Sequence, residues 1–354
     1  MNRALYTLLI LVLLAGATTL ATAGNPDRQG EAGASELNML PYARLAGLSG
    51  MNTSTVSGVE AMRLNIAGLS RIQKTEFTVG QGIYLQGTEI NMSAFGFAQK
   101  VGENGTLGAS VMALNFGDLP VTTVGQPEGT GATFSPTFFN VGIGYSHLFE
   151  NKISVGILFR GISQRISDLS AQSFAVDAGV QYVTGDLDNF KFGISLRNIG
   201  APMRFDGEGL SFSTEIPFEG QGYGLAVNQR SADFELQSAL NIGGSYDFYL
   251  GDKSRLTIIG NFTSNSFSLD QLGGGAEFSF NEIVTLRGGY QYSIGLEDLN
   301  AVDAPIYTGV SGGISIDVPV GREAVKNGFG IDYAYRASRL FGGTHNIGVR
   351  LAIN

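Results

Sequence analysis

The sequence predicts an all-β fold: a transmembrane antiparallel β-barrel of about 14 strands with an N-terminal plug of short helices. Segments of about ten residues alternate apolar and polar side chains, which is the pattern of outer-membrane barrel strands. Only 15% of residues are charged, against roughly 25% in ordinary soluble domains. No mature stretch approaches the ~20 apolar residues of a membrane helix. Since only helices and closed barrels span lipid, a membrane protein of this kind must be a barrel.

Composition excludes several classes of function. The chain has 354 residues, a formal net charge of −9 and a pI near 4.8, so it offers no basic stripe for nucleic acid. It has no cysteine, which excludes disulfides, thiolate metal sites and a lipid anchor on cysteine. We therefore expect a membrane protein with no nucleic-acid partner.

Residues 1–23 have the features of a secretory signal peptide. Arg3 gives a positive start, Leu8 to Ala15 is an apolar run, and Ala21-Thr22-Ala23 is a small-x-small cleavage site. A true membrane helix is the alternative, but the apolar run is too short to span a bilayer. We expect cleavage after Ala23 and insertion into the bacterial outer membrane.

Residues 24–73 are expected to form a loose tail followed by a plug. The segment from Glu36 to Gly50 suits a turn or short helix, and Ser57 to Leu69 has apolar residues at helical spacing. Such short helices need a partner to pack on. Strand counting places both mature termini on the periplasmic side, so the plug is expected to enter the barrel from there.

Residues 74–354 are expected to form the barrel. In one segment Phe139, Val141, Ile143 and Tyr145 alternate with polar or small residues. The strands are expected at 74–85, 89–101, 106–116, 137–149, 153–164, 174–184, 190–199, 235–249, 254–265, 271–281, 283–295, 307–318, 328–338 and 344–354. Their connections alternate between short and long, apart from the tight Gln86-Gly87-Thr88, as periplasmic turns and extracellular loops do.

Several charged side chains fall on the polar face of these strands and are expected to point into the lumen. An arginine facing lipid at mid-membrane costs roughly 2–4 kcal/mol, so the inward direction is favoured. The main candidates are Arg160, Arg197, Arg287, Asp332, Arg336 and Arg350. Two readings are open, a network that pairs the wall with the plug and a selective pore for a charged solute. The expected plug favours the network.

The longest expected loop, from Gly200 to Asp233, is unusually apolar. Its candidate contact residues are Phe205, Leu210, Phe212, Ile216 and Phe218. Exposed apolar surface of this kind marks interaction sites. The loop either folds over the barrel mouth or docks a partner or cargo domain. A further reading is that part of it extends neighbouring strands above the membrane.

Catalysis is not expected. The two histidines, His147 and His345, lie far apart in the chain, and no triad, metal-ligand cluster or phosphate loop is apparent. Gly273-Gly274-Gly275 lies in an expected strand, where glycine marks a bulge or a close approach to the plug. We expect no cofactor, no metal and no enzymatic activity.

The N-terminal segment carries a recurring set of motifs. Gly33-Ala34, Ala43-Arg44, Ser49-Gly50-Met51 and the run from Leu64 to Leu69 follow one another in the order and spacing of a known pattern. In this the chain resembles the PorV/PorQ family, whose members are FadL-like barrels of 14 strands associated with the type IX secretion system of Bacteroidota. Leu64 and Ile66 stand where the family has an aromatic residue and proline. The matching plug motif residues are Ala43, Arg44, Asn65, Ala67, Gly68 and Leu69.

The resemblance implies a role in protein secretion and surface attachment without catalysis. Partners would be type IX translocon or sortase-complex proteins and secreted cargo domains, with outer-membrane lipid around the barrel. FadL-like relatives instead take up hydrophobic molecules, which would place lipid or detergent inside the barrel. A structural scaffold of a surface or motility complex is the third alternative.

Overall fold

The computed structural model describes residues 28, 30–218, 221–296, 304–319 and 328–353. The expected signal peptide, the connection at 321–327 and most of the loop at 296–305 lie outside the described residues.

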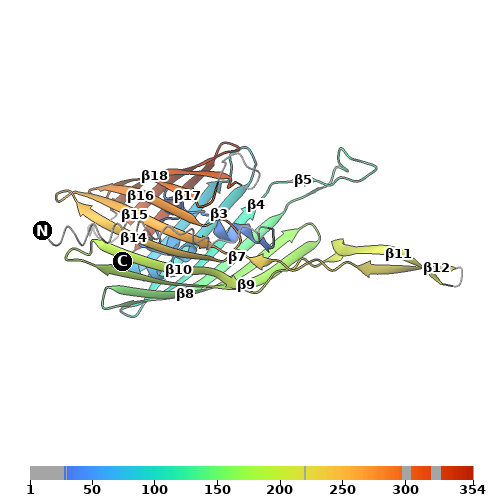
Figure 1. The fold of residues 1–354 in the computed structure, drawn as a ribbon, viewed down its shortest axis with the longest axis horizontal. Coiled ribbons are helices and arrows are strands. Elements are labelled where there is room, and N and C mark those ends of the chain that lie inside the picture. Colours follow the sequence, from blue (N-terminus) through green and yellow to red (C-terminus); the bar gives the residue numbers. More distant parts are fainter. Residues whose placement is uncertain (1–27, 29, 219–220, 297–303, 320–327, 354) are drawn as a thin grey trace.

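Fourteen antiparallel strands form one closed barrel (Figure 1). They are β2 Thr75–Ile83, β3 Asn91–Val101, β4 Gly105–Asn115, β7 Thr137–Phe149, β8 Ile153–Ile166, β9 Leu169–Thr184, β10 Phe190–Gly200, β14 Ala239–Tyr249, β15 Ser254–Asn265, β16 Gln271–Phe280, β17 Val284–Ser293, β18 Tyr307–Pro319, β19 Gly328–Ser338 and β20 Thr344–Ile353. Neighbours in the chain are neighbours in the barrel, and β20 closes it by pairing with β2. The prediction of a 14-strand antiparallel barrel is confirmed.

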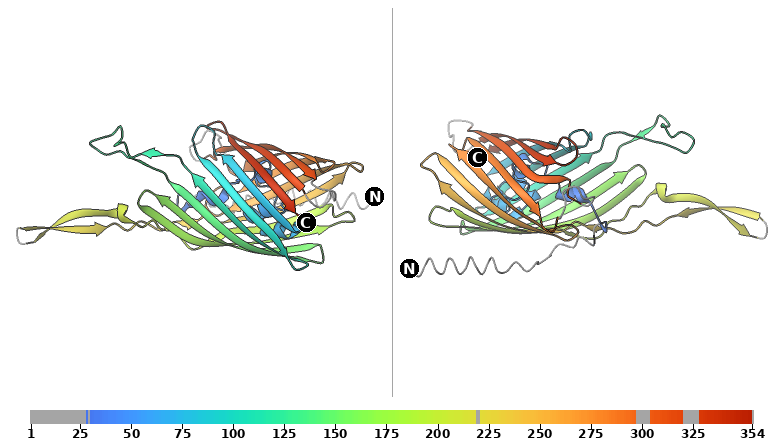
Figure 2. Two further views of the ribbon diagram at one scale, coloured as in Figure 1. Left: turned by 180° about the vertical axis from the view of Figure 1, so that it is seen from behind. Right: turned by 45° about the horizontal axis from the view of Figure 1, so that its top comes forward.

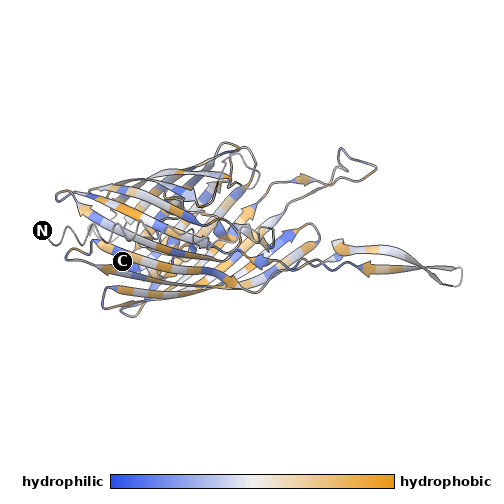
Figure 3. Ribbon diagram, viewed as in Figure 1, coloured by the Kyte–Doolittle hydropathy of each residue, from blue (hydrophilic) through white to orange (hydrophobic). Residues whose placement is uncertain are grey.

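Alternation along each strand explains the barrel. On β7, Val141 and Ile143 are exposed at 36% and 62%, whereas the alternating residues Asn140 and Gly142 are buried. The same alternation of apolar and polar residues continues around the wall (Figure 3). A closed barrel that exposes apolar side chains outward suits a lipid surround. No described helix is long and apolar enough to span a membrane.

The connections differ between the two ends of the barrel. Tight turns join β3 to β4, β7 to β8, β14 to β15 and β16 to β17 at one end, here the turn end. The opposite end, the loop end, carries two hairpins that project away from the barrel (Figure 2). They are β5/β6 (Leu119–Pro120 and Thr133–Phe134) and β11/β12 (Ser211–Phe218 and Gln221–Asn228), the latter preceded by the short helix η5 (Glu208–Leu210).

Two strand starts differ from expectation at the loop end. Strand β9 begins before 174, because β8 and β9 stay paired as far as Ile166 and Leu169. Strand β14 begins after 235, because Glu235–Leu236 forms the separate strand β13. Strand β13 pairs with β1, Ala32–Gly33, instead of with the barrel wall.

The N-terminal segment fills the lumen. We call residues 34–72 the plug. It contains η2 Ser35–Asn38, α2 Ala43–Ala46, η3 Val59–Arg63 and η4 Ile66–Arg71. Nearly all of its side chains are buried. One helix was expected over residues 57–69, but η3 and η4 are separate because Asn65 adopts an extended conformation and accepts a hydrogen bond from the Ala67 N–H.

The plug enters from the loop end, so the expectation of entry from the periplasmic turn end is wrong. Strand β1 pairs in parallel with β13, and Arg28 forms an ion pair with Glu235 at 3.0 Å. Ala34 and Leu37 then pack with Met203 and Leu236. The plug runs through the lumen and ends at Arg71, close to the start of β2 at the turn end. Local contacts at the loop end, which strand counting does not register, determine this path.

Candidate functional site

The plug lies directly against inward-facing glycines of the wall. A Cβ added to Gly193 would lie 2.5 Å from the Thr53 carbonyl oxygen, and one added to Gly156 would lie 2.9 Å from that of Ile66. Other wall glycines that face plug atoms as closely are Gly80, Gly96, Gly108, Gly144, Gly179, Gly273, Gly275 and Gly289. We call these ten positions the glycine belt. Its members lie on strands from β2 to β17, so the plug is held around most of the barrel.

Two residues of the triple glycine of β16 belong to this belt. Gly273 faces Met51 and Gly275 faces Leu48 of the plug. Strand β16 keeps an unbroken register with β15 and β17 at these residues. Of the two readings that the sequence left open, close approach to the plug is therefore the one that applies.

Asn65 connects the plug to the wall. Its Nδ2 donates to the carbonyl oxygens of Thr53 at 3.0 Å and Val180 at 3.1 Å, and the second of these is on β9. The neighbouring carbonyl of Ala67 accepts a hydrogen bond of 2.9 Å from Ser146 Oγ on β7. Both residues are fully buried. Asn65 and Ala67 thus hold η4 against two neighbouring parts of the wall.

The other motif residues act within the plug or its apolar core. Arg44 pairs with Glu60 at 3.0 Å. Ala43 and Leu69 are buried in the main apolar cluster. Gly68 packs against the Val56 carbonyl inside the plug, so its close contact is with the plug and not with the wall.

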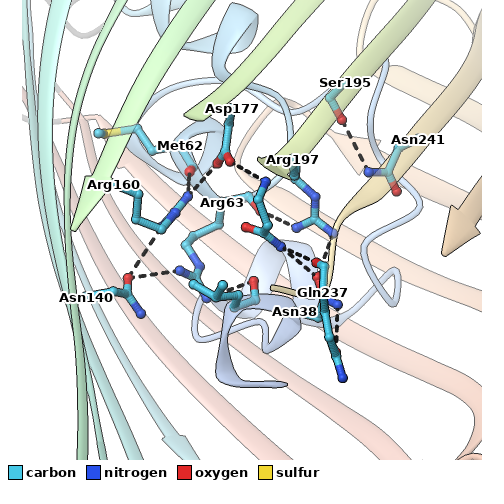
Figure 4. A network of polar contacts seen from close by, with 12 residues as sticks. Asn38, Met62, Arg63, Asn140, Arg160, Asp177, Ser195, Arg197, Gln237 and Asn241 are labelled. Carbon is cyan, nitrogen blue, oxygen red and sulfur yellow. Dashed lines mark hydrogen bonds and ion pairs between the residues drawn. The ribbon is translucent and has the colours of Figure 1, made fainter. Parts of the chain in front are cut away.

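All six candidate lumen charges lie inside the barrel. Two of them, Arg160 and Arg197, join a network around the plug (Figure 4). Arg160 pairs with Asp177 at 2.7 Å and donates to the Met62 carbonyl at 2.9 Å. Arg197 donates to the Arg63 carbonyl at 2.7 Å. Plug backbone oxygens therefore accept from wall arginines, which ties the two parts together.

Arg63 occupies the centre of this network. Its Nη2 donates to the carbonyls of Glu36 at 2.9 Å and Met39 at 3.1 Å, and its Nη1 donates to Asn140 Oδ1 at 3.1 Å. The side chain is 2% exposed. A buried cation is tolerable only when such partners replace water. Arg63 thereby joins η2, η3 and the wall strand β7.

Three further lumen charges form a second group towards the turn end. Arg287 pairs with Glu277 at 3.0 Å, and Arg350 pairs with Asp317 at 2.7 Å. Asp332 lies 3.7 Å from Arg350 and accepts a hydrogen bond from Ser315. This group pairs wall strands with one another, so only part of the expected wall–plug network involves the plug.

Arg336, the sixth lumen charge, has a different environment. Its guanidinium lies over the Tyr307 ring, 3.8 Å from the ring centre. Within the described part of the chain no ion pair or hydrogen bond to Arg336 occurs, and its Nε is buried without a partner.

Two carboxyl groups of the plug are buried. Burial raises the pKa of Glu36, and hydrogen bonds from Gln164 act against this rise. Burial likewise raises the pKa of Glu60, while Arg44 acts to lower it. The plug holds both groups away from water.

Water-accessible space remains on both sides of the plug. The loop-end cavity has a volume of about 270 Å³. At the turn end, cavities of about 590 and 360 Å³ adjoin each other and share Arg71, Lys191 and Arg255. The loop-end cavity has no lining residue in common with either of them. Polar and charged side chains dominate the linings, so these spaces do not form an apolar tunnel.

The candidate partner-binding residues are dispersed. Phe205 stacks on Phe234 at 5.8 Å next to the cluster that holds the start of the plug. Leu210 is half-buried and Phe212 is 52% exposed on β11. The side chains of Ile216 and Phe218 lie outside the described part of the structure.

Sequence reasoning missed several wall side chains that bind the plug. Gln181 Nε2 donates to the carbonyls of Thr53 at 3.1 Å and Val56 at 2.9 Å, and Gln164 binds Glu36. Glu76 accepts from the Val59 N–H at 2.8 Å. Their inward position in the alternating pattern was the available signal. No cluster of metal-ligating side chains occurs in the residues that the structure describes.

Comparisons with known proteins identify the fold. No known family model matches the chain, and no curated protein matches it. Among solved structures, a mutant of the TodX monoaromatic hydrocarbon channel is similar with a TM-score of 0.55 and 13% identity, over 88% of this chain and 98% of that one.

Two further structures show the same likeness. The CymD monoaromatic hydrocarbon channel has a TM-score of 0.52 and 14% identity, over 89% and 96% of the two chains. The Ralstonia pickettii toluene transporter TbuX has a TM-score of 0.51 and 13% identity, over 90% and 99%. At these identities the likeness establishes a shared barrel fold.

Proposed function

We propose that this chain is an outer-membrane barrel that docks proteins at its rim while the plug keeps its lumen closed. The observation that carries the proposal is the fit of the plug on the glycine belt, reinforced by the buried hydrogen bonds of Asn65, Arg160 and Arg197. A plug that contacts the wall around most of the barrel is fixed in place and does not act as a loose gate. In outer-membrane barrels long loops face outward and short turns face the periplasm, which puts the two hairpins outside the cell.

The hairpin β11/β12 is the proposed docking surface. Phe212 opposes Val227 and Thr214 opposes Leu225, so Phe212, Leu225 and Val227 share one face. Phe212 and Leu225 are 52% and 46% exposed. A two-stranded hairpin alone is marginally stable in water, so a partner that covers this face would also stabilise the hairpin.

The sequence supports the identity of the partner. The plug motif, with Ala43, Arg44, Asn65, Ala67, Gly68 and Leu69, resembles that of PorV/PorQ proteins. We therefore propose that the partners are type IX translocon or sortase-complex proteins and the cargo domains they handle. The chain then acts without catalysis in secretion or surface attachment.

Substitution of the hairpin tests this proposal. The double variant Phe212→Ser/Leu225→Ser, in the full-length chain in its native membrane, is expected to lose co-purification of secretion partners and to leave cargo unprocessed in the periplasm. Val124→Ser is the matched control, because Val124 is exposed on the other hairpin at the same end. Normal secretion and unchanged partners in the double variant would count against docking through β11/β12.

A channel for hydrophobic molecules is the second candidate, and the fold comparisons favour it. The three similar structures are named as hydrocarbon channels or a toluene transporter. Against it stand the polar linings of the lumen cavities and the tight packing of the plug on the wall among the described residues. Deletion of the gene separates the candidates: slower growth on hydrocarbons or fatty acids with intact secretion supports the channel, and retained cargo supports docking. Intact growth and secretion with loss of a surface complex would support a scaffold.

A further inference from the structure

The loop-end cavity is lined by a distinctive set of side chains. It lies between the plug and strands β10 and β14 to β19. Its amide-bearing residues are Asn38, Gln237, Asn241, Asn265, Gln271 and Gln291, and its hydroxyl-bearing residues are Ser35, Ser49, Tyr84, Thr263, Ser268 and Tyr307. Such groups donate and accept hydrogen bonds in many directions. A ligand with several hydroxyl groups suits them.

Two arginines and no carboxylate complete the lining. Arg197 and Arg336 face the same space, and the residues that line it include neither aspartate nor glutamate. Within the described part of the chain neither arginine has an ion pair within 4.0 Å, and the Nε of each is buried without a partner. A cation without a paired anion in a partly dry site is costly, and an anion relieves that cost.

The two ends of the lumen differ in this respect. In the turn-end cavity the cations face carboxylates, since Glu60, Glu277, Glu282 and Asp317 line it together with Arg44, Arg287 and Arg350. Of these two cavities, only the loop-end cavity is lined by arginines without any carboxylate. The positive charge without paired carboxylates is thus a property of the loop-end cavity and not of the lumen as a whole.

We propose that the loop-end cavity binds a small hydrophilic carboxylate of the acidic-sugar type. The carboxylate would bind the Arg336 guanidinium, whose planar donors suit two carboxylate oxygens. The sugar hydroxyls would bind the side-chain amides of Gln271 and Gln291, which line the cavity. The volume of about 270 Å³ is near the lower limit of ligand sites, so the ligand is about one sugar unit.

This proposal is independent of the docking function. The site faces the loop end and uses wall residues, whereas docking uses the projecting hairpin. It also differs from a site for hydrocarbons, because most of its surface is polar. An alkyl chain there would leave amides and hydroxyls without hydrogen bonds, which costs about 1–3 kcal/mol for each group.

Calorimetric titration of the purified full-length barrel tests the proposal with three probes. Glucuronate is expected to bind saturably with a dissociation constant of about 1 mM or less, and glucose about tenfold or more weakly because it lacks the carboxylate. Decanoate, with a carboxylate on an alkyl chain, is expected to bind more weakly than glucuronate. Equal binding of glucose, tighter binding of decanoate, or no saturable binding of glucuronate would each overturn the proposal.

Variants assign the effect to the cavity. Arg336→Gln is expected to weaken glucuronate binding about tenfold or more, and Arg336→Lys by less, since it keeps the charge. Arg204→Gln is the matched control, because Arg204 is an exposed arginine at the same end that pairs with Asp233 outside the cavity. The thermal midpoint of each variant checks folding. Unchanged affinity in a folded Arg336→Gln barrel would refute the assignment.

Discussion

The plug makes different contacts with the two sides of the barrel wall. From β2 to β8 the inward side chains Met92, Met112, Leu114 and Leu158 pack with plug residues into one dry apolar cluster. From β14 to β17 the inward side chains are Asn241, Thr257, Thr263 and Ser279, and the cavities lie along them. We call these the dry side and the wet side.

The comparison shows how one barrel can be closed and still hold ligand-sized space. On the dry side the hydrophobic effect and close packing fix the plug. On the wet side the plug meets the wall at the glycine belt, at Met51 and Leu48 for example, and through the hydrogen bond between Ser54 and Ser245. The plug therefore acts as a divider between two polar cavities. We expect substitutions to have large effects on the dry side and small ones on the wet side.

Loss of Arg160 is expected to have the largest effect. Arg160→Met leaves Asp177 buried without its cation, which costs about 3–5 kcal/mol of unfolding free energy for such pairs. Guanidinium unfolding in detergent measures it. The double variant Arg160→Met/Asp177→Asn should recover part of the loss. Additive effects of the two substitutions would contradict the pairing.

A methyl group added to the glycine belt is the next test. Gly193→Ala places a Cβ against the backbone of Thr53 and Ser54, and overpacking of this kind costs about 1–3 kcal/mol. Gly348→Ala on β20 is the control, because its new Cβ would meet no atom closer than 3.5 Å. Equal unfolding midpoints of the two variants would show that the belt does not hold the plug.

The buried Glu36 makes the stability of the plug dependent on pH, which gives a third test of the comparison. Because burial raises its folded-state pKa, the folded barrel binds this proton more tightly than the unfolded chain does. The contribution of Glu36 to stability therefore falls as the pH rises from the ordinary pKa of a glutamate through the raised pKa of the folded state. Unfolding curves should therefore be measured between about pH 4 and pH 8, which is roughly the range above the ordinary pKa of glutamate. They should show that Glu36→Gln gains stability over the wild type as the pH rises. A pH-independent difference would contradict this.

The smallest effect is expected on the wet side. Gln291 lines the loop-end cavity and makes no side-chain hydrogen bond that the described residues reveal. Gln291→Ala is therefore expected to change the unfolding free energy by less than about 0.5 kcal/mol. A loss of several times that value would show that the wet side also holds the plug.

Much of the fold was predictable because alternation in each strand is local. Phe139 to Tyr145 reveal their outward face without any knowledge of the neighbours. The entry side of the plug was not predictable, since it depends on a two-residue pairing between β1 and β13 that has no sequence pattern. The arginine directions were predictable from the same alternation. Their partners were not, because Arg160 and Arg197 bind plug carbonyls that any residue could supply.

The distinction between dry and wet sides is visible in the sequence. Once the outward face of a strand is known, Met92 and Met112 stand inward on one side, and Asn241 and Thr263 stand inward on the other. Inward apolar residues predict where a plug packs, and inward amides predict where water and polar ligands remain. The cavity that contains Arg336 could not be predicted from the sequence, because its lining residues come from strands far apart in the chain.

A disulfide lock tests most directly whether the plug stays in place while the protein works. Ser54 of the plug and Ser245 of β14 have hydroxyl oxygens 3.2 Å apart, and the chain has no cysteine of its own. Ser54→Cys/Ser245→Cys should therefore form one defined crosslink, with each single variant as control. We predict that cells with the locked plug process and attach cargo as the wild type does. Loss of function on oxidation, restored by a reductant, would contradict a fixed plug.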